Sequence, residues 1–291
     1  MTGPRTAAAI DRSRPMPQID GLVRSIAIPP RPALLVKLQE EVGRDEPDSR
    51  RIAAIVGKDV ALTVAVLRSV NSPFFGLSRR AETVDQAVSL LGLRQIGALV
   101  TGLVLRQVLR QPGVDLSAFW TVSQRRAFAL TQLASGLRGV ASELAHSFGL
   151  FCDVGVPLLM PRFADYVSVL DDAARATDRP CTAIEQATYK TDHALVGSLM
   201  ARTWGLSPLV SQAIRHHHEP AALVHPETPD TVSRLVAMNL LAERALEHHA
   251  GTGGNAEWTK GGAAASDALG LATDEVDGWT LRLSEGFSLV D

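Results

Sequence analysis

The chain has 291 residues, 46% of them hydrophobic, so it is long enough to bury more than one compact unit. Its 29 basic and 31 acidic residues nearly balance, which excludes a global charge field that recruits nucleic acid or an anionic membrane. No apolar run reaches transmembrane length, and no secretory apolar core follows the N-terminal arginines. With only Cys152 and Cys181 present, a disulfide framework is not expected, and we predict a cytoplasmic protein that binds neither nucleic acid nor membrane.

In chain order, residues 1–18 are polar and contain prolines, which predicts a flexible N-terminal segment. Residues 19–27 are expected to form a short helix, and prolines then force an extended entry into a helix that begins at Pro32. Apolar residues at helical spacing continue as far as Pro112, where a break is predicted. The predicted N-terminal helical subdomain therefore covers residues 19–112.

Within this half, a helix, a turn and a second helix are predicted over residues 59–93. Asp59 is a suitable N-cap for the first helix, and Pro73 ends it. We call the turn that follows the elbow, and its residues are Asn71, Pro73, Phe74, Phe75 and Gly76. Because two adjacent phenylalanines are too apolar for a free loop, the elbow is expected to be structural, filling a junction between subdomains, or to bind a partner.

The second helix is predicted from a capping box, Thr83-Val84-Asp85-Gln86, and ends at Gly92. Residues 113–250 show helical periodicity without strand-like alternation, which predicts a second helical subdomain. The glycine-rich stretch 251–262 predicts a mobile linker, and a terminal helix is expected after Thr273, so residues 251–291 form a linker and a C-terminal helix. The predicted fold class is all-α, with two helical subdomains.

Three motifs in this order carry a resemblance to a known family: Ile28-Pro29-Pro30-Arg31-Pro32, Asn71-Ser72-Pro73-Phe74-Phe75-Gly76 and Leu90-Leu91-Gly92-Leu93. Over roughly residues 19–246 the chain resembles HDOD domains, bacterial regulatory modules related to the HD metal-dependent phosphohydrolases. The resemblance implies an HDOD-type helical bundle in the first half, an HD-like helical bundle in the second, and a regulatory role in bacterial signal transduction.

The resemblance also implies where a hydrolytic metal centre would lie. HD phosphohydrolases use a histidine after a Phe-Trp-like helix start, a His-Asp pair and a distal aspartate, and the matching positions here are Val122, Cys152-Asp153 and Asn239. Valine cannot ligate, and a neutral asparagine is a poor substitute for a carboxylate at a hard divalent cation. A buried cysteine is most often a small core residue. We therefore predict no catalytic residue, no enzyme activity and no cofactor.

His193, His217 and His218 complicate that prediction, because they match additional metal-binding histidines of HD-GYP phosphodiesterases, which split cyclic dinucleotides. The Gly-Tyr-Pro element of that group is absent. With Asp153, these histidines are the candidate ligand pocket, expected to be hydrogen-bonded within a polar site. If a metal binds, the fallback prediction is a single zinc or iron ion on these four residues. With its histidines protonated, the same pocket would suit a small anionic or nucleotide ligand.

Two functions from different classes remain open. The favoured one is a non-catalytic signalling module that binds a signalling protein partner or a small ligand. The alternative is a residual metal-dependent phosphohydrolase or phosphodiesterase acting on a nucleotide. Other templates are excluded, since the chain has no glycine-rich phosphate loop, no CxxC pair and no helix that concentrates Arg, Lys, Asn and Gln as a DNA-recognition helix would.

Overall fold

The computed structural model describes residue 26, residues 28–252 and residues 256–289. Within these residues the chain contains helices and no strands, which confirms the predicted all-α fold class. None of the described helices is long and apolar enough to span a bilayer. The flexible segment predicted over residues 1–18 and nearly all of the helix predicted over 19–27 lie outside the described residues.

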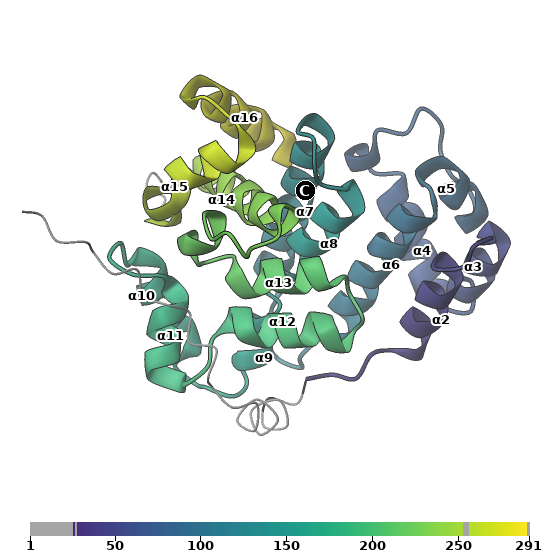
Figure 1. Ribbon diagram of the computed structural model, residues 1–291. Coiled ribbons are helices and arrows are strands. Elements are labelled where there is room, and N and C mark those ends of the chain that lie inside the picture. The colour runs from purple at the N-terminus through teal and green to yellow at the C-terminus, as the bar shows by residue number, and fades with distance from the viewer. Residues whose placement is uncertain (1–25, 27, 253–255, 290–291) are drawn as a thin grey trace, which may run out of the picture.

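The N-terminal half begins with an extended segment that leads into helices on one side of the molecule (Figure 1). The predicted caps are present: the Asp59 side chain accepts a hydrogen bond from Leu62 N at 2.9 Å, and Thr83 Oγ1 accepts one from Gln86 N at 3.1 Å. The reciprocal bond of the capping box is displaced by one residue, because Gln86 Oε1 accepts from Glu82 N. The elements are α2 (Ala33–Val42), α3 (Ser49–Val56), α4 (Val60–Val70), the 3₁₀ turn η1 (Pro73–Phe75), α5 (Val84–Leu91) and α6 (Leu93–Val108).

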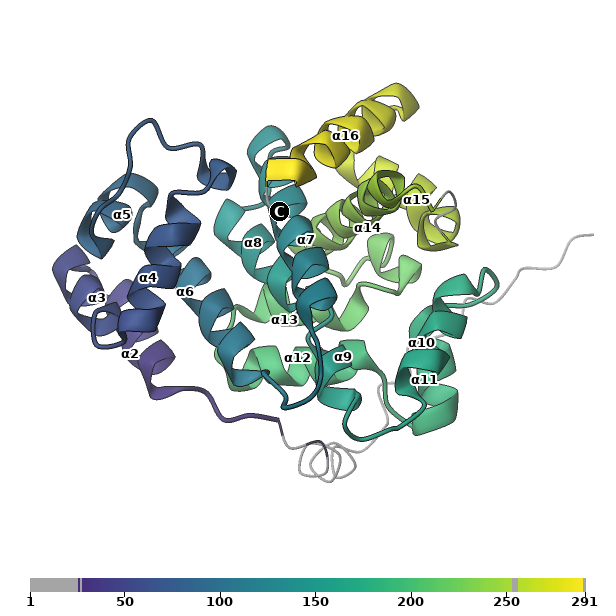
Figure 2. The same ribbon diagram turned by 180° about the vertical axis from the view of Figure 1, so that it is seen from behind.

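The second half surrounds the long helices α7 and α14, with α10 and α11 forming a hairpin at the periphery (Figures 1 and 2). Its elements are α7 (Ser117–Gly136), α8 (Ser142–Phe151), α9 (Gly155–Leu159), α10 (Tyr166–Arg175), α11 (Cys181–Tyr189), α12 (His193–Thr203), α13 (Pro208–His216), η2 (Pro220–Leu223), α14 (Asp230–Ala250), α15 (Ala256–Leu269), α16 (Thr273–Gly286) and η3 (Phe287–Leu289).

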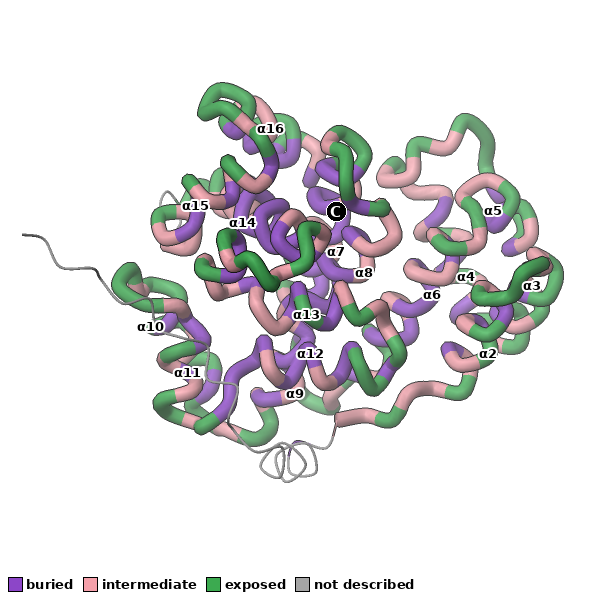
Figure 3. The backbone as a smooth tube through the Cα atoms, in the orientation of Figure 1, coloured by how far each residue is buried: buried purple, intermediate pink, exposed green. Residues whose placement is uncertain are grey.

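One connected cluster of buried apolar side chains runs through both halves, from Leu35 on α2 to Phe287 on η3. Burial is concentrated on α7, α14 and the inner faces of their neighbours (Figure 3). The two halves are also joined by a hydrogen bond from Trp204 Nε1 to the Pro29 carbonyl, 3.0 Å long. The boundary predicted after Pro112 falls in the loop between α6 and α7 and stays a prediction, since the core is continuous across it.

The prediction of a glycine-rich linker through Gly262 is wrong from Ala256 onward, because α15 begins there. Gly261 is buried, and a Cβ added to it would lie 3.0 Å from Leu240 of α14 and 3.5 Å from Pro220 of η2. The missing side chain therefore lets α15 approach α14 closely. Gly261 therefore allows close packing of two helices here and does not mark a flexible linker.

Candidate functional site

The four side chains of the candidate ligand pocket meet at one point, and we call them the histidine pocket: Asp153, His193, His217 and His218. Asp153 lies between α8 and α9, His193 begins α12, and the other two histidines follow α13. One ligand atom from each residue lies within 4.8 Å of the others. Nε2 of His217 is 3.2 Å from Asp153 Oδ1. Nε2 of His218 is 3.1 Å from Nε2 of His193.

Two glycines allow the backbone segments around the pocket to approach each other. A Cβ on Gly155 at the start of α9 would lie 2.0 Å from the carbonyl oxygen of His193. A Cβ on Gly149 of α8 would lie 2.6 Å from the Cα of Ala127 on α7. Because no side chain fits at either position, α8 and α9 are held tightly between α7 and α12. This packing places Asp153 within reach of both helices.

The outer nitrogen of each imidazole faces an acceptor. The Nδ1 contacts are Glu185 Oε2 at 2.6 Å from His193, the Ile214 carbonyl at 2.7 Å from His217, and Glu257 Oε2 at 3.6 Å from His218. A carbonyl only accepts, so a neutral His217 carries its proton on Nδ1 and presents a lone pair at Nε2. The hydrogen-bond partners thus assign the same tautomer to His193 when it is neutral. Lone pairs of both rings then point toward the Asp153 carboxylate.

The protonation of these rings follows from burial and from their partners. Burial, together with the neighbouring His218, lowers the pKa of His217 to about 4, so this ring is neutral at pH 7. Burial also acts to lower the pKa of His193, but the hydrogen bond and charge of Glu185 outweigh it and raise that pKa above its ordinary value. Because acceptors converge on the pocket centre, a proton on His193 or a metal ion there would satisfy them.

A buried arginine lies on the other side of Asp153. The Arg126 side chain on α7 is 6% exposed, with Nη1 2.7 Å from Asp153 Oδ2 and Nη2 3.6 Å from Glu243 Oε1. Burial acts to raise the pKa of Asp153, but the Arg126 guanidinium holds it well below its usual range. Sequence reasoning missed this residue, although a charged side chain between Ser123 and Leu130 on the apolar face of α7 was an available signal.

The remaining positions matched to HD metal ligands are neutral. Val122 is 40% exposed on α7, one turn before Arg126. The Cys152 thiol is buried with Sγ 3.7 Å from Asn239 Oδ1, and Asn239 Nδ2 donates to Glu243 Oε1 at 2.9 Å. Burial raises the pKa of Cys152 well above its usual value, so the thiol stays protonated. The second oxygen of Asp153 is therefore contacted by the Arg126 guanidinium, and none of these three matched positions supplies a charged ligand.

The donor set of the histidine pocket fits one divalent ion. Tetrahedral ligands at zinc–nitrogen distances of roughly 2.0–2.1 Å lie about 3.3 Å apart. The inner nitrogens of His193 and His217 are 3.4 Å apart, and each lies 3.2–3.7 Å from Asp153 Oδ1. In protein metal sites the imidazole ligands usually donate their outer N–H to a carboxylate or a carbonyl, as His193 and His217 do here. Asp153, His193, His217 and His218 would hold the ion.

Several supporting residues had no signal in the sequence. Glu185 accepts a hydrogen bond from the Tyr166 hydroxyl as well as contacting His193, so it is fixed on both sides. Cys181 lies near Glu185 and His193 and also near the Glu257 side of the pocket. Glu257 belongs to α15, inside the stretch predicted as a linker. These contacts arise only when α11 and α15 pack onto the centre.

The elbow lies apart from the histidine pocket and contacts α7 and α8. The half-buried Phe74 ring has its centroid 5.5 Å from that of Phe128 on α7 and 6.1 Å from that of His146 on α8. The Asn71 side chain donates to the Ala81 carbonyl and accepts from the Ala81 N–H, both at 2.8 Å. Phe74 therefore fills a junction between the two halves, while Asn71 closes the loop behind it.

Comparison with known sequences gives one family and two distant relatives. The profile of the HDOD domain family matches residues 28–220. An uncharacterized protein of Treponema pallidum (strain Nichols) is 24% identical over 212 residues, which cover 72% of this chain and 40% of that protein. The uncharacterized protein YuxH of Bacillus subtilis (strain 168) is 30% identical over 60 residues, 21% of this chain and 15% of YuxH. The chain thus spans less than half the length of these curated relatives.

Crystal structures of three other proteins resemble the fold. A candidate phosphohydrolase from Shewanella amazonensis SB2B is 23% identical, with a TM-score of 0.68 over 92% of this chain and 94% of that one. A candidate signal transduction protein from Marinobacter aquaeolei VT8 is 22% identical, with a TM-score of 0.69 over 92% of this chain and 59% of that one. An HDOD domain protein with unknown function from Geobacter sulfurreducens is 18% identical, with a TM-score of 0.66 over 93% and 97%. At these identities the likeness is one of fold.

Proposed function

The chain belongs to the HDOD domain family, and we propose that it is a non-catalytic module of bacterial signal transduction that binds a protein partner or a small ligand. The observation that carries this proposal is the buried ion pair between Arg126 and Asp153, 2.7 Å long. Asp153 is the one residue of the expected HD ligand set that this chain retains. Its second carboxylate oxygen is committed to a side chain of the protein itself.

A guanidinium neutralises a carboxylate without supplying a nucleophile. Arginine has only donors and does not deprotonate in proteins, so Arg126 can neither accept a proton from water nor leave an open coordination position. Burial acts to lower the pKa of Arg126, but the charges of Asp153 and Glu243 outweigh it, so the pKa lies above its ordinary value. Two-ion hydrolysis uses two metals roughly 3.5–4 Å apart that clamp the attacking and leaving oxygens. With Arg126 against Asp153, the chain offers ligands for one ion at most around this carboxylate.

The test is a hydrolysis assay with cyclic dinucleotides, nucleoside phosphates and a generic phosphodiester, in the presence of Mg²⁺, Mn²⁺, Zn²⁺ or Fe²⁺. We expect the parent protein to turn over none of them faster than Asp153→Ala does. Asp171→Ala, which removes an exposed carboxylate on α10, is the matched control. Metal-dependent turnover that disappears in Asp153→Ala but persists in the control would establish the alternative, a residual phosphohydrolase.

A second candidate function is a single-ion centre in the histidine pocket, and the convergence of inner imidazole nitrogens on Asp153 favours it. Zinc or iron held there would supply a fixed positive charge that links α12 and α13 to the loop after α8. Glu185 orients His193, the Ile214 carbonyl orients His217, and Arg126 balances the remaining charge of Asp153.

Elemental analysis of protein purified without an affinity tag tests this second candidate. This candidate, the fallback to a pocket without a cofactor, requires one zinc or iron per chain, lost when His217→Ala and His218→Ala are combined. His216→Ala combined with His225→Ala removes two histidines outside the pocket and should retain the ion. A cobalt(II)-substituted sample gives a spectroscopic readout of tetrahedral ligation that does not depend on activity. A parent protein that stays metal-free after reconstitution with zinc and with iron would contradict the single-ion centre.

A further inference from the structure

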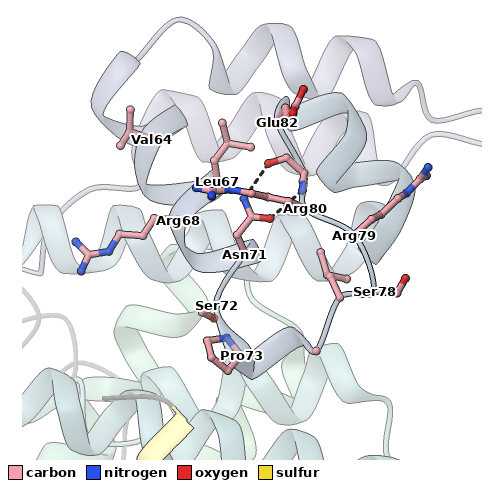
Figure 4. Close-up of a pocket in the computed structure, with 13 residues that line it drawn as sticks. Val64, Leu67, Arg68, Asn71, Ser72, Pro73, Ser78, Arg79, Arg80 and Glu82 are labelled. Atoms are coloured by element: carbon pink, nitrogen blue, oxygen red, sulfur yellow. Dashed lines mark hydrogen bonds between the residues drawn. The ribbon is translucent and has the colours of Figure 1, made fainter.

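An open groove lies beside the elbow, between α4 and the loop that leads to α5 (Figure 4). We call it the elbow groove. Its volume is about 970 Å³, and Leu67, Asn71, Arg68, Arg79 and Arg80 are among the residues that line it. Figure 4 shows Arg68 on α4 at one end of the groove and Arg79 on the loop at the other. The groove therefore combines a helix face with a set of guanidinium groups.

The loop that carries two of these arginines is fixed in place. Asn71, which ends α4, makes reciprocal 2.8 Å hydrogen bonds with both backbone groups of Ala81 (Figure 4). Ala81 is buried, with 2% of its surface exposed. Arg79 and Arg80 come directly before this anchored residue, so their backbone positions are set before anything binds. A pre-formed site loses less conformational entropy on binding than a flexible loop does.

The positive charge of the elbow groove is not balanced. Arg68, Arg79 and Arg80 are exposed, and none of them has an ion-pair partner within the described part of the chain. Glu82 is the one acidic residue among the lining side chains. Other exposed arginines do pair, for example Arg175 with Asp172 at 2.9 Å. A net positive surface thus faces solvent beside the elbow.

An apolar stripe continues the groove along α4. Val60 and Val64 are 76% and 60% exposed, which is unusual for large apolar side chains, and the half-buried Leu67 follows them. Their spacing of four and then three residues places them on one face of the helix. At 1.5 Å per residue the stripe is about 10 Å long. A compact anion would leave this stripe in water.

We propose that the elbow groove and its apolar stripe form the docking surface for an acidic, amphipathic segment of a protein partner. Carboxylates of the segment pair with Arg68, Arg79 and Arg80, and its apolar side chains cover Val60 and Val64. This inference rests on the proposed binding function and names the surface and the partner chemistry. The segment runs lengthwise along α4, because the apolar side chains and Arg68 lie along that helix, while Arg79 and Arg80 face it from the loop on the other side of the groove.

Other occupants fit the surface less well. The groove lining contains no aromatic side chain on which a nucleotide base would stack. The chain's own residues 1–18 contain Arg5, Arg12 and Arg14 against a single acidic residue, so their charge has the wrong sign. A lipid surface would bring its anionic headgroups against Glu82.

The experiment selects binders to the full-length protein from a displayed library of random dodecapeptides. We expect enrichment of sequences that combine Asp or Glu with large apolar residues. Anisotropy with a labelled selected peptide should show affinity about tenfold weaker or worse for Arg79→Glu combined with Arg80→Glu, and for Val64→Asp. Arg106→Glu combined with Arg110→Glu makes the same charge change on exposed positions at the end of α6 and just after it, and should bind like the parent. Circular dichroism verifies that every variant is folded.

Several results would overturn the proposal. One is a library selected to completion without an acidic binder, and another is a control pair, Arg106→Glu with Arg110→Glu, that weakens peptide binding as much as the groove variants do. Selected peptides that bind the groove variants as tightly as the parent would overturn it too. A self-association lost only in the groove variants would assign the surface to a second copy of the chain. Phosphate, nucleotide or vesicle binding that displaces the peptide would assign it to those ligands. Hydrolytic activity in the assay above would end the proposed non-catalytic role while leaving peptide docking intact, so the two failures are distinguishable.

Discussion

The histidine pocket and the elbow groove treat charge in opposite ways. In the pocket the charged side chains are buried or largely buried and pair with one another: Arg126 pairs with Asp153 and Glu243, and His193 contacts Glu185. In the groove the arginines are exposed, and no ion-pair partner for them occurs in the described residues. A buried charge must be paired, whereas an unpaired charge persists only in water. The pocket thus holds its charged side chains in mutual contact, whereas the groove leaves its guanidinium groups open to a partner.

The two regions meet through α7. Phe128 contacts Phe74 of the elbow, and it lies two residues after Arg126, which contacts Asp153. Phe128 also makes an edge-to-face contact with Phe287 on η3, with ring centroids 6.2 Å apart. Helix α7 therefore contacts both the elbow and the pocket, so the free energies of unfolding of variants in the two regions can be compared directly.

The largest expected effect comes from breaking the buried ion pair. Arg126→Met strands the carboxylates of Asp153 and Glu243, and we expect a loss of about 3–5 kcal/mol in the free energy of unfolding at pH 7. Adding Glu243→Gln removes one stranded charge and should recover part of this loss. Urea unfolding provides the measurement. A single variant with the midpoint of the parent would show that Asp153 finds another cation.

Of the two elbow rings, that of Phe74 should contribute most to the free energy of unfolding. Phe74→Ala removes contacts with Phe128 and His146, and because the ring is half-buried we expect about 3 kcal/mol, the lower end of the range for such truncations. Phe75 has its ring contact with Phe74, so Phe75→Ala should cost less than half as much. Thermal melting compares the two variants. If both melt like the parent but lose peptide binding, the elbow is an exposed binding hot spot instead.

Lowering the pH should reduce the stability of the folded chain through His146, a buried histidine beside the elbow. Burial lowers the pKa of His146 from 6.5 to about 4, and its Nδ1 has no hydrogen-bond partner in the described structure. Between pH 6.5 and 4 the imidazole of His146 is therefore protonated in the unfolded chain but stays neutral in the folded chain. The free energy of unfolding falls as the pH drops through this range, by about 3 kcal/mol for this group.

The raised pKa values of Glu243 and Glu247 act in the opposite direction below pH 7, so the test is a difference between variants. Relative to the parent, His146→Leu should gain stability progressively between pH 6.5 and 4. His225→Gln, a change outside both regions, is the control. Parallel pH profiles of the parent and His146→Leu, from denaturant unfolding, would show that His146 does not refuse the proton.

The smallest expected effect on stability belongs to the groove. Arg79→Ala combined with Arg80→Ala removes exposed charges without an ion-pair partner in the described chain, and we expect the melting temperature to stay within about 2 °C of the parent. Peptide binding should nevertheless be lost. A large fall in the melting temperature would mean that these arginines hold the loop, which would make the groove structural.

The sequence by itself determined several element boundaries, because caps and breaks act over a few residues. Asp59 and Thr83 cap the helices predicted from them, and Pro73 with Gly76 forms the turn between those helices. The all-α class follows from the same local periodicity. The set Asp153, His193, His217 and His218 came from family resemblance, since no spacing along one helix relates these four residues.

Only the tertiary structure decided which polar groups face one another. Gly261 has linker composition in the sequence, yet it lies inside α15, where a side chain would crowd Leu240 of α14. Arg126 reaches the pocket from α7, far from its histidines along the chain, whereas Glu185 on α11 lies eight residues before His193 and faces it only because α11 folds back onto α12. Such contacts depend on how close helices pack and on which buried charge needs a partner, and neither quantity is encoded in local periodicity.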